Sequence, residues 1–203
     1  MWIKICGLTT AEAVEAALDA NVDAIGFVFA QSVRQVTPEL AARLAAPARG
    51  RVRCVAVTRH PTQSDIDAIL AGFNPDILQT DAADLRGLKL PVTLERLPVM
   101  RDADVGSAAA THDLPRRLLF EGASSGTGVP CDWTAAGRVA RQTELVLAGG
   151  LTPDNVAAAV AAVRPFGVDV SSGVEARPGV KSPARIANFV KAVRAGGAHK
   201  DPV

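Results

Sequence analysis

The sequence has no excess of charge of either sign and no long hydrophobic run. Its 203 residues include 22 Lys and Arg and 21 Asp and Glu, which gives a formal net charge of +1. Proteins that hold DNA or RNA through its phosphates normally carry a basic excess. No apolar run approaches the ~20 residues that cross a bilayer, and the first ten residues lack the order of a signal peptide. We therefore expect a cytoplasmic, water-soluble domain without a nucleic-acid or membrane partner.

Cysteine and histidine are also scarce. The chain has three cysteines at widely spaced positions: Cys6, Cys54 and Cys131. An odd number without a C-x-x-C pair indicates neither a disulfide framework nor a zinc site. The histidines lie in turn-like or terminal sequence, outside any H-E-x-x-H pattern: His60, His112 and His199. We expect no structural or catalytic metal.

The residues that are present have an ordinary globular composition, with 48% apolar and 21% charged side chains. Short apolar runs alternate with Ala-rich stretches of helical length. Eight runs are expected to form strands: 2–6, 24–29, 51–57, 76–79, 92–96, 117–121, 144–148 and 167–170. Several are apolar nearly throughout, as strands buried on both faces should be. We expect one domain over residues 1–195 and a frayed tail over residues 196–203.

Strands that alternate with helices are expected to pair in parallel through right-handed crossovers. This pattern fits an α/β fold of two kinds, a single closed (β/α)8 TIM barrel or an open doubly wound sheet. The count of eight favours the barrel, although the length is near the lower limit for one. The strand at 92–96 is the weakest of the eight, because Pro91 and Pro98 bracket a charged Glu95-Arg96 pair.

Ligands of parallel α/β folds collect at the carboxyl ends of the strands. Cys6 ends the first strand there, either as a small packing residue or as a thiolate in a positive local potential. Arg34 is either a bidentate partner for a carboxylate or a solvated loop charge. Glu121 is either a partly desolvated general acid or a partner of a rim arginine. Asp169 points inward and is expected to orient other groups.

Glycine-rich turns follow the seventh and eighth strands. In barrels this is where backbone N–H groups and a short helix hold a phosphate. The residues of these turns are Gly149, Gly150, Ser171, Ser172 and Gly173. A third glycine-rich turn, at 124–128, is neither a P-loop nor a dinucleotide fingerprint. The turns predict a small phosphorylated ligand.

Five segments together resemble the phosphoribosylanthranilate isomerase family of tryptophan biosynthesis. They are KICGLT at 4–9, GFVF at 26–29, S-x-R-x-V-x-P at 32–38, LAGGL-x-P-x-N at 147–155, and VDVSSGVE at 168–175 followed by Pro178-Gly179 and Lys181. The resemblance runs in order along nearly the whole chain.

The resemblance implies a (β/α)8 barrel that carries out an Amadori rearrangement without metal or organic cofactor. N-(5-phospho-D-ribosyl)anthranilate would become 1-(2-carboxyphenylamino)-1-deoxy-D-ribulose 5-phosphate. Cys6 matches the general base, Arg34 the arginine for the anthranilate carboxylate, and Asp169 an aspartate in the mouth of the site. The turns at Gly149-Gly150 and at 171–173 match the phosphate site. The expected partner is this small phosphosugar, and the expected oligomeric state is a monomer or weak homodimer.

The sequence departs from the family pattern at two strand ends. Glu121 replaces the family's aspartate as general acid, and Gln79-Thr80-Asp81-Ala82 replaces Gln-Leu-His-Gly. Asp81 is expected to add negative potential that disfavours a thiolate at Cys6. Asp169 and Asp81 are alternative acids. Two other functions stay open from the residues, a related sugar-phosphate isomerase or epimerase and a non-catalytic phosphosugar-binding barrel.

Overall fold

The eight expected strands form a closed parallel barrel. The computed structural model describes residues 1–101, 114–122 and 131–197. The strands, each paired with the next, are β1 Trp2–Cys6, β2 Ala24–Val28, β3 Arg53–Val57, β4 Ile77–Asp81, β5 Glu95–Arg101, β6 Arg117–Glu121, β7 Glu144–Leu147 and β8 Gly167–Val170. Because β1 also pairs in parallel with β8, the ring is closed. The TIM barrel is confirmed over the open sheet.

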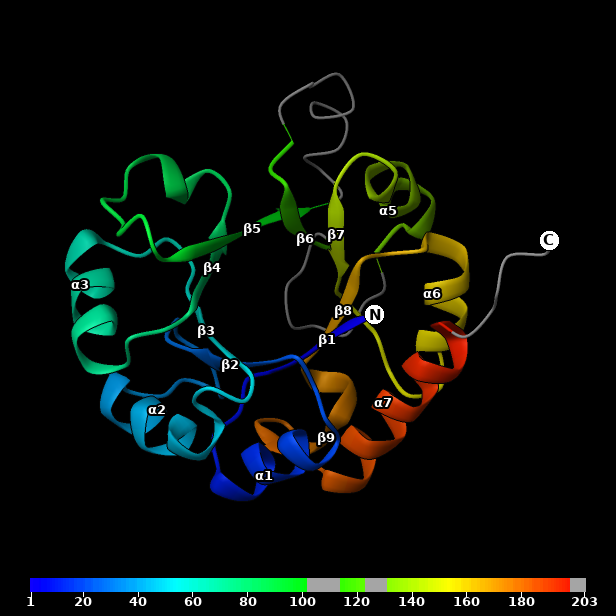
Figure 1. The fold of residues 1–203 in the computed structure, drawn as a ribbon, viewed down its shortest axis with the longest axis horizontal. Helices are drawn as coiled ribbons and strands as arrows, with labels where there is room; N and C mark the ends of the chain where they lie inside the picture. The colour runs from blue at the N-terminus through cyan, green and yellow to red at the C-terminus, as the bar shows by residue number, and fades with distance from the viewer. Residues whose placement is uncertain (102–113, 123–130, 198–203) are drawn as a thin grey trace.

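Helices surround the barrel (Figure 1). They are α1 Ala11–Asp19, α2 Pro38–Ala45, α3 Gln63–Gly72, α5 Trp133–Ala140, α6 Val156–Val163 and α7 Pro183–Gly197, with the short 3-10 helices η1 Ala46–Ala48, η2 Asp84–Arg86 and η3 Ser172–Val174. Between β4 and β5 the only helix is η2, so the strand–helix alternation is shortened there. None of the helices that the structure describes is long and apolar enough to span a membrane.

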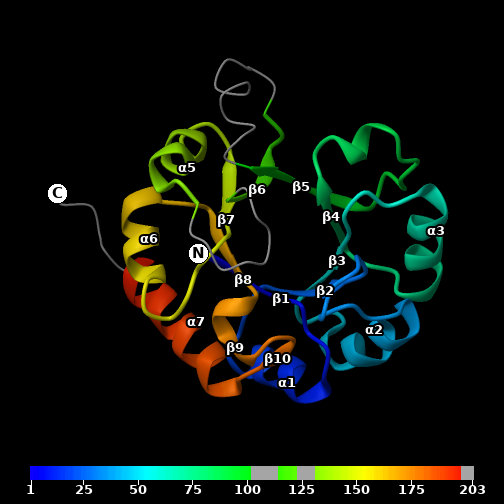
Figure 2. The ribbon, with the colours of Figure 1, turned by 180° about the vertical axis from the view of Figure 1, so that it is seen from behind.

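A small hairpin of β9 Glu175–Arg177 and β10 Val180–Lys181 follows β8. Figures 1 and 2 both show this hairpin beside α1, and the Thr9 hydroxyl donates to the Gly179 carbonyl at 3.1 Å. The chain then enters α7, which continues to Gly197, two residues beyond the expected end of the domain. Residues 198–203 lie outside the described residues, so the C-terminal tail stays a prediction.

Strand β5 differs from the expected strand at 92–96. It begins at Glu95 and continues to Arg101, with Pro98 inside it. Pro98 pairs with Thr80 of β4, while pairing with β6 begins only at Val99. The proline therefore stands where the strand has one neighbour, and a missing N–H is tolerated there as it is on an edge strand. The extension carries Arg101 to the carboxyl end of the barrel.

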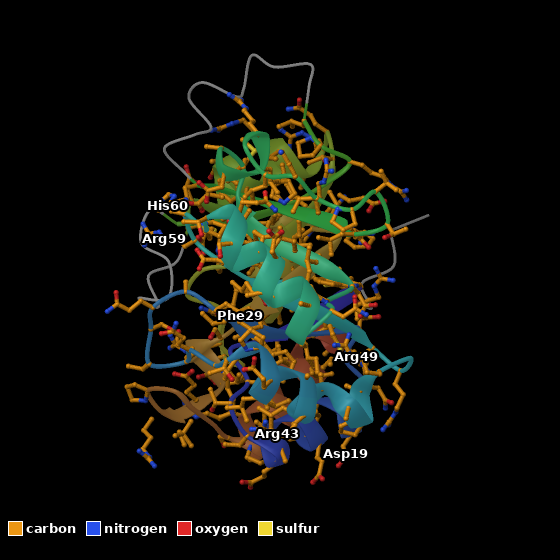
Figure 3. The ribbon with its side chains drawn as sticks, turned by 90° about the vertical axis from the view of Figure 1, so that its left-hand side faces the viewer. Asp19, Phe29, Arg43, Arg49, Arg59 and His60 are labelled. Carbon is orange, nitrogen blue, oxygen red and sulfur yellow. The ribbon has the colours of Figure 1, made fainter. Side chains whose placement is uncertain are left out.

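The core has two layers because the side chains of each strand alternate between the barrel interior and the helices. The interior layer contains Ala24, Val55, Ile77, Leu97, Val99, Leu119, Val146 and Ala148. A larger apolar layer, with Phe27, Phe120 and Phe189 among its buried side chains, joins the outside of the barrel to the helices. Seen from the side, Arg59 and His60 lie at one end of the barrel and Asp19 and Arg49 at the other (Figure 3).

The closure of the ring depends on a close approach between β1 and β8. Gly167 pairs with Trp2, and a Cβ on Gly167 would lie 2.7 Å from the Trp2 carbonyl oxygen. We expect Gly167→Ala to lower the free energy of unfolding by roughly 1–3 kcal/mol, because the added methyl group overpacks this contact. Urea denaturation followed by circular dichroism measures the change.

Gly87→Ala is the matched control, because nothing lies within 4 Å of a Cβ built there and its φ of −98° suits any residue. Its free energy of unfolding should stay within about 0.5 kcal/mol of the unsubstituted protein. Equal stability of the two variants would mean that the contact between Gly167 and Trp2 does not limit closure.

Candidate active site

The carboxyl ends of the strands surround a cavity of about 220 Å³. Four of the site residues predicted from the sequence line this cavity: Cys6, Arg34, Glu121 and Asp169. Ser171 of the predicted phosphate turns lines it as well. Gln79, Asp81 and Arg101 also line it. The buried Gln79 Oε1 has no hydrogen-bond partner in the described part of the chain, so it offers an acceptor toward this cavity.

Cys6 ends β1 next to two charged groups of the barrel interior. Lys4 has no exposed surface, and its Nζ lies 2.9 Å from Asp169 Oδ1. Burial raises the pKa of the Cys6 thiol, and Asp169 adds to the rise, while the positive charges of Lys4 and Lys181 oppose it. The side chain that Asp169 holds is Lys4.

Arg34 is held by Glu175 of the hairpin. Its Nε and Nη2 donate to the two carboxylate oxygens of Glu175 at 2.6 and 2.9 Å, and Lys181 Nζ donates to the same carboxylate at 2.8 Å. Burial alone would raise the pKa of Glu175, but the hydrogen bonds from Arg34 and Lys181 outweigh it and lower this pKa to about 2. Burial lowers the pKa of Lys181. Arg34 is therefore a fixed group and not a solvated charge.

Gly7, the residue after Cys6, leaves space for the Arg34 side chain. It has a φ of +74°, and a Cβ there would lie 2.6 Å from Arg34 Cδ and 3.0 Å from Ser171 Oγ. The Arg34 side chain thus crosses the turn that directly follows Cys6. Only glycine combines this backbone conformation with the required space.

Glu121 and Asp81 share one arginine. Arg101 Nη2 lies 3.2 Å from Glu121 Oε1 and 2.7 Å from Asp81 Oδ1. The sequence-based alternative of an arginine partner for Glu121 is thus seen in the structure. The carboxylate that raises the pKa of the thiol is Asp169, and the expected effect of Asp81 on Cys6 stays a prediction.

His60, Asp81 and Asp84 form the one group of possible metal ligands among the described residues, with their ligand atoms within 4.8 Å of one another. His60 Nδ1 lies 3.1 Å from Asp84 Oδ1, and the His60 N–H donates to Asp84 Oδ2 at 2.9 Å. Asp81 is in an ion pair with Arg101, whose positive charge opposes a cation. The three side chains thus form a cluster of hydrogen bonds and ion pairs at the rim of the barrel.

The two predicted phosphate turns meet at one edge of the barrel. Gly149 and Gly150 have φ of 86° and 63°, and a Cβ on Gly173 would overlap the carbonyl oxygen of Leu151. Lys181 Nζ donates to the Ser171 carbonyl at 2.9 Å and contacts its hydroxyl at 3.2 Å. Ser172 and Gly173 line a neighbouring depression with residues 152–154. The glycine-rich segment 124–128 lies outside the described residues.

Four side chains of this site had no role assigned from the sequence: Lys4, Arg101, Glu175 and Lys181. Lys4, Glu175 and Lys181 belong to the motifs that carry the family resemblance. Lys4 could also have been found from its spacing, because residues two apart on a strand share a face, and Lys4 is two residues from Cys6. Arg101 was missed because the fifth strand was expected to end at residue 96.

Comparisons with known proteins agree with this geometry. The family model for N-(5'phosphoribosyl)anthranilate (PRA) isomerase matches residues 3–192. The N-(5'-phosphoribosyl)anthranilate isomerase of Rhizobium etli (strain CIAT 652) is 41% identical, over 97% of this chain and 95% of that protein. The crystal structure of TrpF from Jonesia denitrificans is 35% identical, with a TM-score of 0.79 over 98% of this chain and 100% of that one.

A third relative was solved with a ligand. A phosphoribosyl anthranilate isomerase in complex with reduced 1-(o-carboxyphenylamino)-1-deoxyribulose 5-phosphate superposes with a TM-score of 0.79 and 28% identity, over 96% of this chain and 99% of that one. The family model and the relatives span almost all of this sequence. The chain belongs to the N-(5'-phosphoribosyl)anthranilate isomerase family.

Proposed function

We propose that this protein isomerises N-(5-phospho-D-ribosyl)anthranilate to 1-(2-carboxyphenylamino)-1-deoxy-D-ribulose 5-phosphate, a step of tryptophan biosynthesis. The observation that carries the proposal is the placement of Cys6 on β1 and Glu121 on β6 in the wall of one cavity, in a member of this family. A thiol and a carboxyl group on separate strands supply the two proton transfers that an aldose-to-ketose shift needs.

Glu121 acts as the acid in this proposal. It gives a proton to the furanose ring oxygen, the C1–O bond breaks, and the lone pair of the anthranilate nitrogen forms a C=N bond to C1. Cys6, as a thiolate, then takes the proton from C2. The bonding electrons move to give an enolamine, which tautomerises to the amino ketone. The overall change is an isomerisation, so no oxidant, reductant or cofactor is required.

The Arg101 ion pairs support Glu121 as the acid despite its longer side chain. Asp81 binds the guanidinium more closely than Glu121 does, at 2.7 against 3.2 Å. Asp81 therefore shares the guanidinium of Arg101 with Glu121. It also leaves Glu121 as the carboxylate that is less tightly paired with Arg101, which favours Glu121 over Asp81 as the proton donor.

Arg34 is proposed to bind the anthranilate carboxylate. Glu175 takes Nε and one hydrogen of Nη2, which fixes the plane of the guanidinium. The other edge, formed by Nη1 and the second hydrogen of Nη2, then remains for a substrate carboxylate. Such pre-orientation lowers the entropy lost when the substrate binds.

The phosphate is proposed to bind at the turns of Gly149-Gly150 and of Ser171, Ser172 and Gly173. Lys181 contacts Ser171 and contributes positive charge beside the second turn. A phosphate held there places the sugar across the barrel mouth between β1 and β6, which is the arrangement that brings both catalytic groups to it.

We further propose a cytoplasmic enzyme that works as a monomer or weak homodimer. All three cysteines are free and buried, in accord with a reducing compartment. Among the described residues the exposed large apolar side chains are Met1, Val33 and Val92. Such scattered residues do not form the large apolar patch of an obligate interface.

Replacement of the proposed base tests the mechanism most directly. Cys6→Ser should lower kcat at least about 100-fold, because a serine hydroxyl is far more weakly acidic than a thiol and takes a carbon-bound proton poorly. The assay uses freshly made phosphoribosylanthranilate. Cys54→Ala, which removes a cysteine that faces the helices instead of the cavity, should keep the kcat of the unsubstituted protein. Turnover by Cys6→Ser at the normal rate would remove Cys6 from the role of base.

The acid is tested by a substitution that keeps shape and removes the proton. Glu121→Gln should lower kcat about 100-fold or more and change KM by much less, since the proton transfer belongs to the transition state. Glu144→Gln provides a control with the same chemical change: Glu144 pairs with Arg117 at the amino end of the barrel, and its kcat should not move. A retained kcat in Glu121→Gln would transfer the acid role to Asp169 or Asp81.

The substrate role of Arg34 predicts an effect on binding. Arg34→Lys keeps one positive charge but loses the planar bidentate donor. We expect KM to rise roughly 10- to 100-fold, as for the loss of one charge-assisted hydrogen bond, with kcat changed only a few-fold. Arg43→Lys on α2 is the control and should leave both constants unchanged. An unaltered KM in Arg34→Lys would exclude Arg34 as the carboxylate site.

A further inference from the structure

Lys4 occupies a position where a barrel normally has an apolar side chain. Trp2, Lys4 and Cys6 point inward from β1, and Lys4 has no exposed surface. Burying an ammonium group is costly unless it is paired and hydrogen-bonded. Lys4 pairs with Asp169 in the β1–β8 register, and their side chains meet at 2.9 Å. The structure thus keeps a buried positive charge on β1 two residues before Cys6, at the preceding position that faces the barrel interior.

Gly26 leaves a small space beside both the Lys4 ammonium and the Cys6 sulfur. Gly26 pairs with Cys6 across β1 and β2. A Cβ on Gly26 would lie 3.1 Å from Lys4 Nζ and 3.2 Å from Cys6 Sγ. The ammonium and the thiol therefore adjoin the same small space, and the hydrogen bond that Lys4 donates goes to Asp169.

The charged groups around Cys6 come from four elements. They are Lys4 on β1, Asp169 on β8, Lys181 on β10 and Arg34 after β2. Arg34 and Lys181 share the carboxylate of Glu175, whereas Lys4 is paired with Asp169. Burial opposes the charge of Lys4, but Asp169 and Cys6 outweigh it and raise the pKa of Lys4, so the ammonium form persists.

We propose that Lys4 is the positioning residue that makes Cys6 a base: its ammonium, held in place by Asp169, lies beside the sulfur at Gly26 and stabilises the thiolate electrostatically. The inference deepens the proposed function and rests on the role of Cys6 in it. When the thiolate takes the C2 proton, the sulfur becomes neutral. Asp169 then remains as the partner of the Lys4 charge, so no unpaired charge is left in the barrel.

The test measures the pKa of the Cys6 thiol without using activity. In a Cys54→Ala, Cys131→Ala background Cys6 is the only thiol, and the pH dependence of its alkylation by iodoacetamide gives its apparent pKa. Lys4→Met together with Asp169→Asn removes the pair without leaving an unpaired carboxylate. We expect the pKa to rise by about one unit, which slows alkylation about tenfold at pH 7.

Gly26→Ala is a second variant that keeps every charge. Its methyl group would separate the ammonium from the sulfur, so it should raise the pKa of Cys6 in the same direction by a smaller amount. In both variants the acidic limb of the kcat/KM profile should move to higher pH by the same shift. A lysine with only a structural role would lower the melting temperature and leave the pKa of the thiol where it was.

Two results separate the inference from the proposed function. An unchanged pKa of Cys6 in the folded Lys4→Met, Asp169→Asn variant overturns the role of Lys4, whatever happens to turnover. A raised pKa in a protein whose unsubstituted form does not isomerise the substrate upholds the action of Lys4 on the thiol and overturns the proposed function.

Discussion

The ion pair between Lys4 and Asp169 inside the barrel is the interaction on which the site depends. Each partner is nearly out of reach of water, and leaving either one unpaired there would cost roughly 3–5 kcal/mol. The pair therefore constrains its surroundings. β1 and β8 must be neighbours in a register that sets residue 4 beside residue 169, and residue 26 must be small enough to leave space for the ammonium.

The charges in the cavity divide the site into two halves. Around Cys6 the positive charges of Lys4 and Lys181 oppose the rise in the pKa of the thiol that burial and Asp169 cause. Glu121 and Asp81 both contact the guanidinium of Arg101. In the proposed mechanism the first half holds the base and the second half holds the acid.

The sequence predicted the strands that hold Cys6, Glu121 and Asp169 because each lies in a short, largely apolar run: Cys6 and Glu121 end theirs, and Asp169 stands one residue before the end of its run. The prediction of the fifth strand was wrong because Pro98 was taken as a strand boundary. A proline fits inside β5 at this point, since the strand pairs there with β4 alone. The pairing of Arg34 with Glu175 spans 141 residues of sequence. No local pattern reports such a contact, because it arises only when the ring closes and the hairpin folds back over the turn after β1.

The closure of the ring also determines the surroundings of Asp81, the residue that departs from the histidine expected from the family resemblance. Asp81 pairs with Val99 in the β4–β5 register, so Arg101 stands one inward position farther toward the mouth and reaches Asp81 at 2.7 Å. His60 approaches the other oxygen of Asp81 at 3.7 Å. A new carboxylate surrounded in this way adds little negative potential at the sulfur across the ring, since its field is largely cancelled by the guanidinium beside it. The pKa of the thiol is set first by burial, which raises it, and then by the charges of Lys4, Asp169 and Lys181.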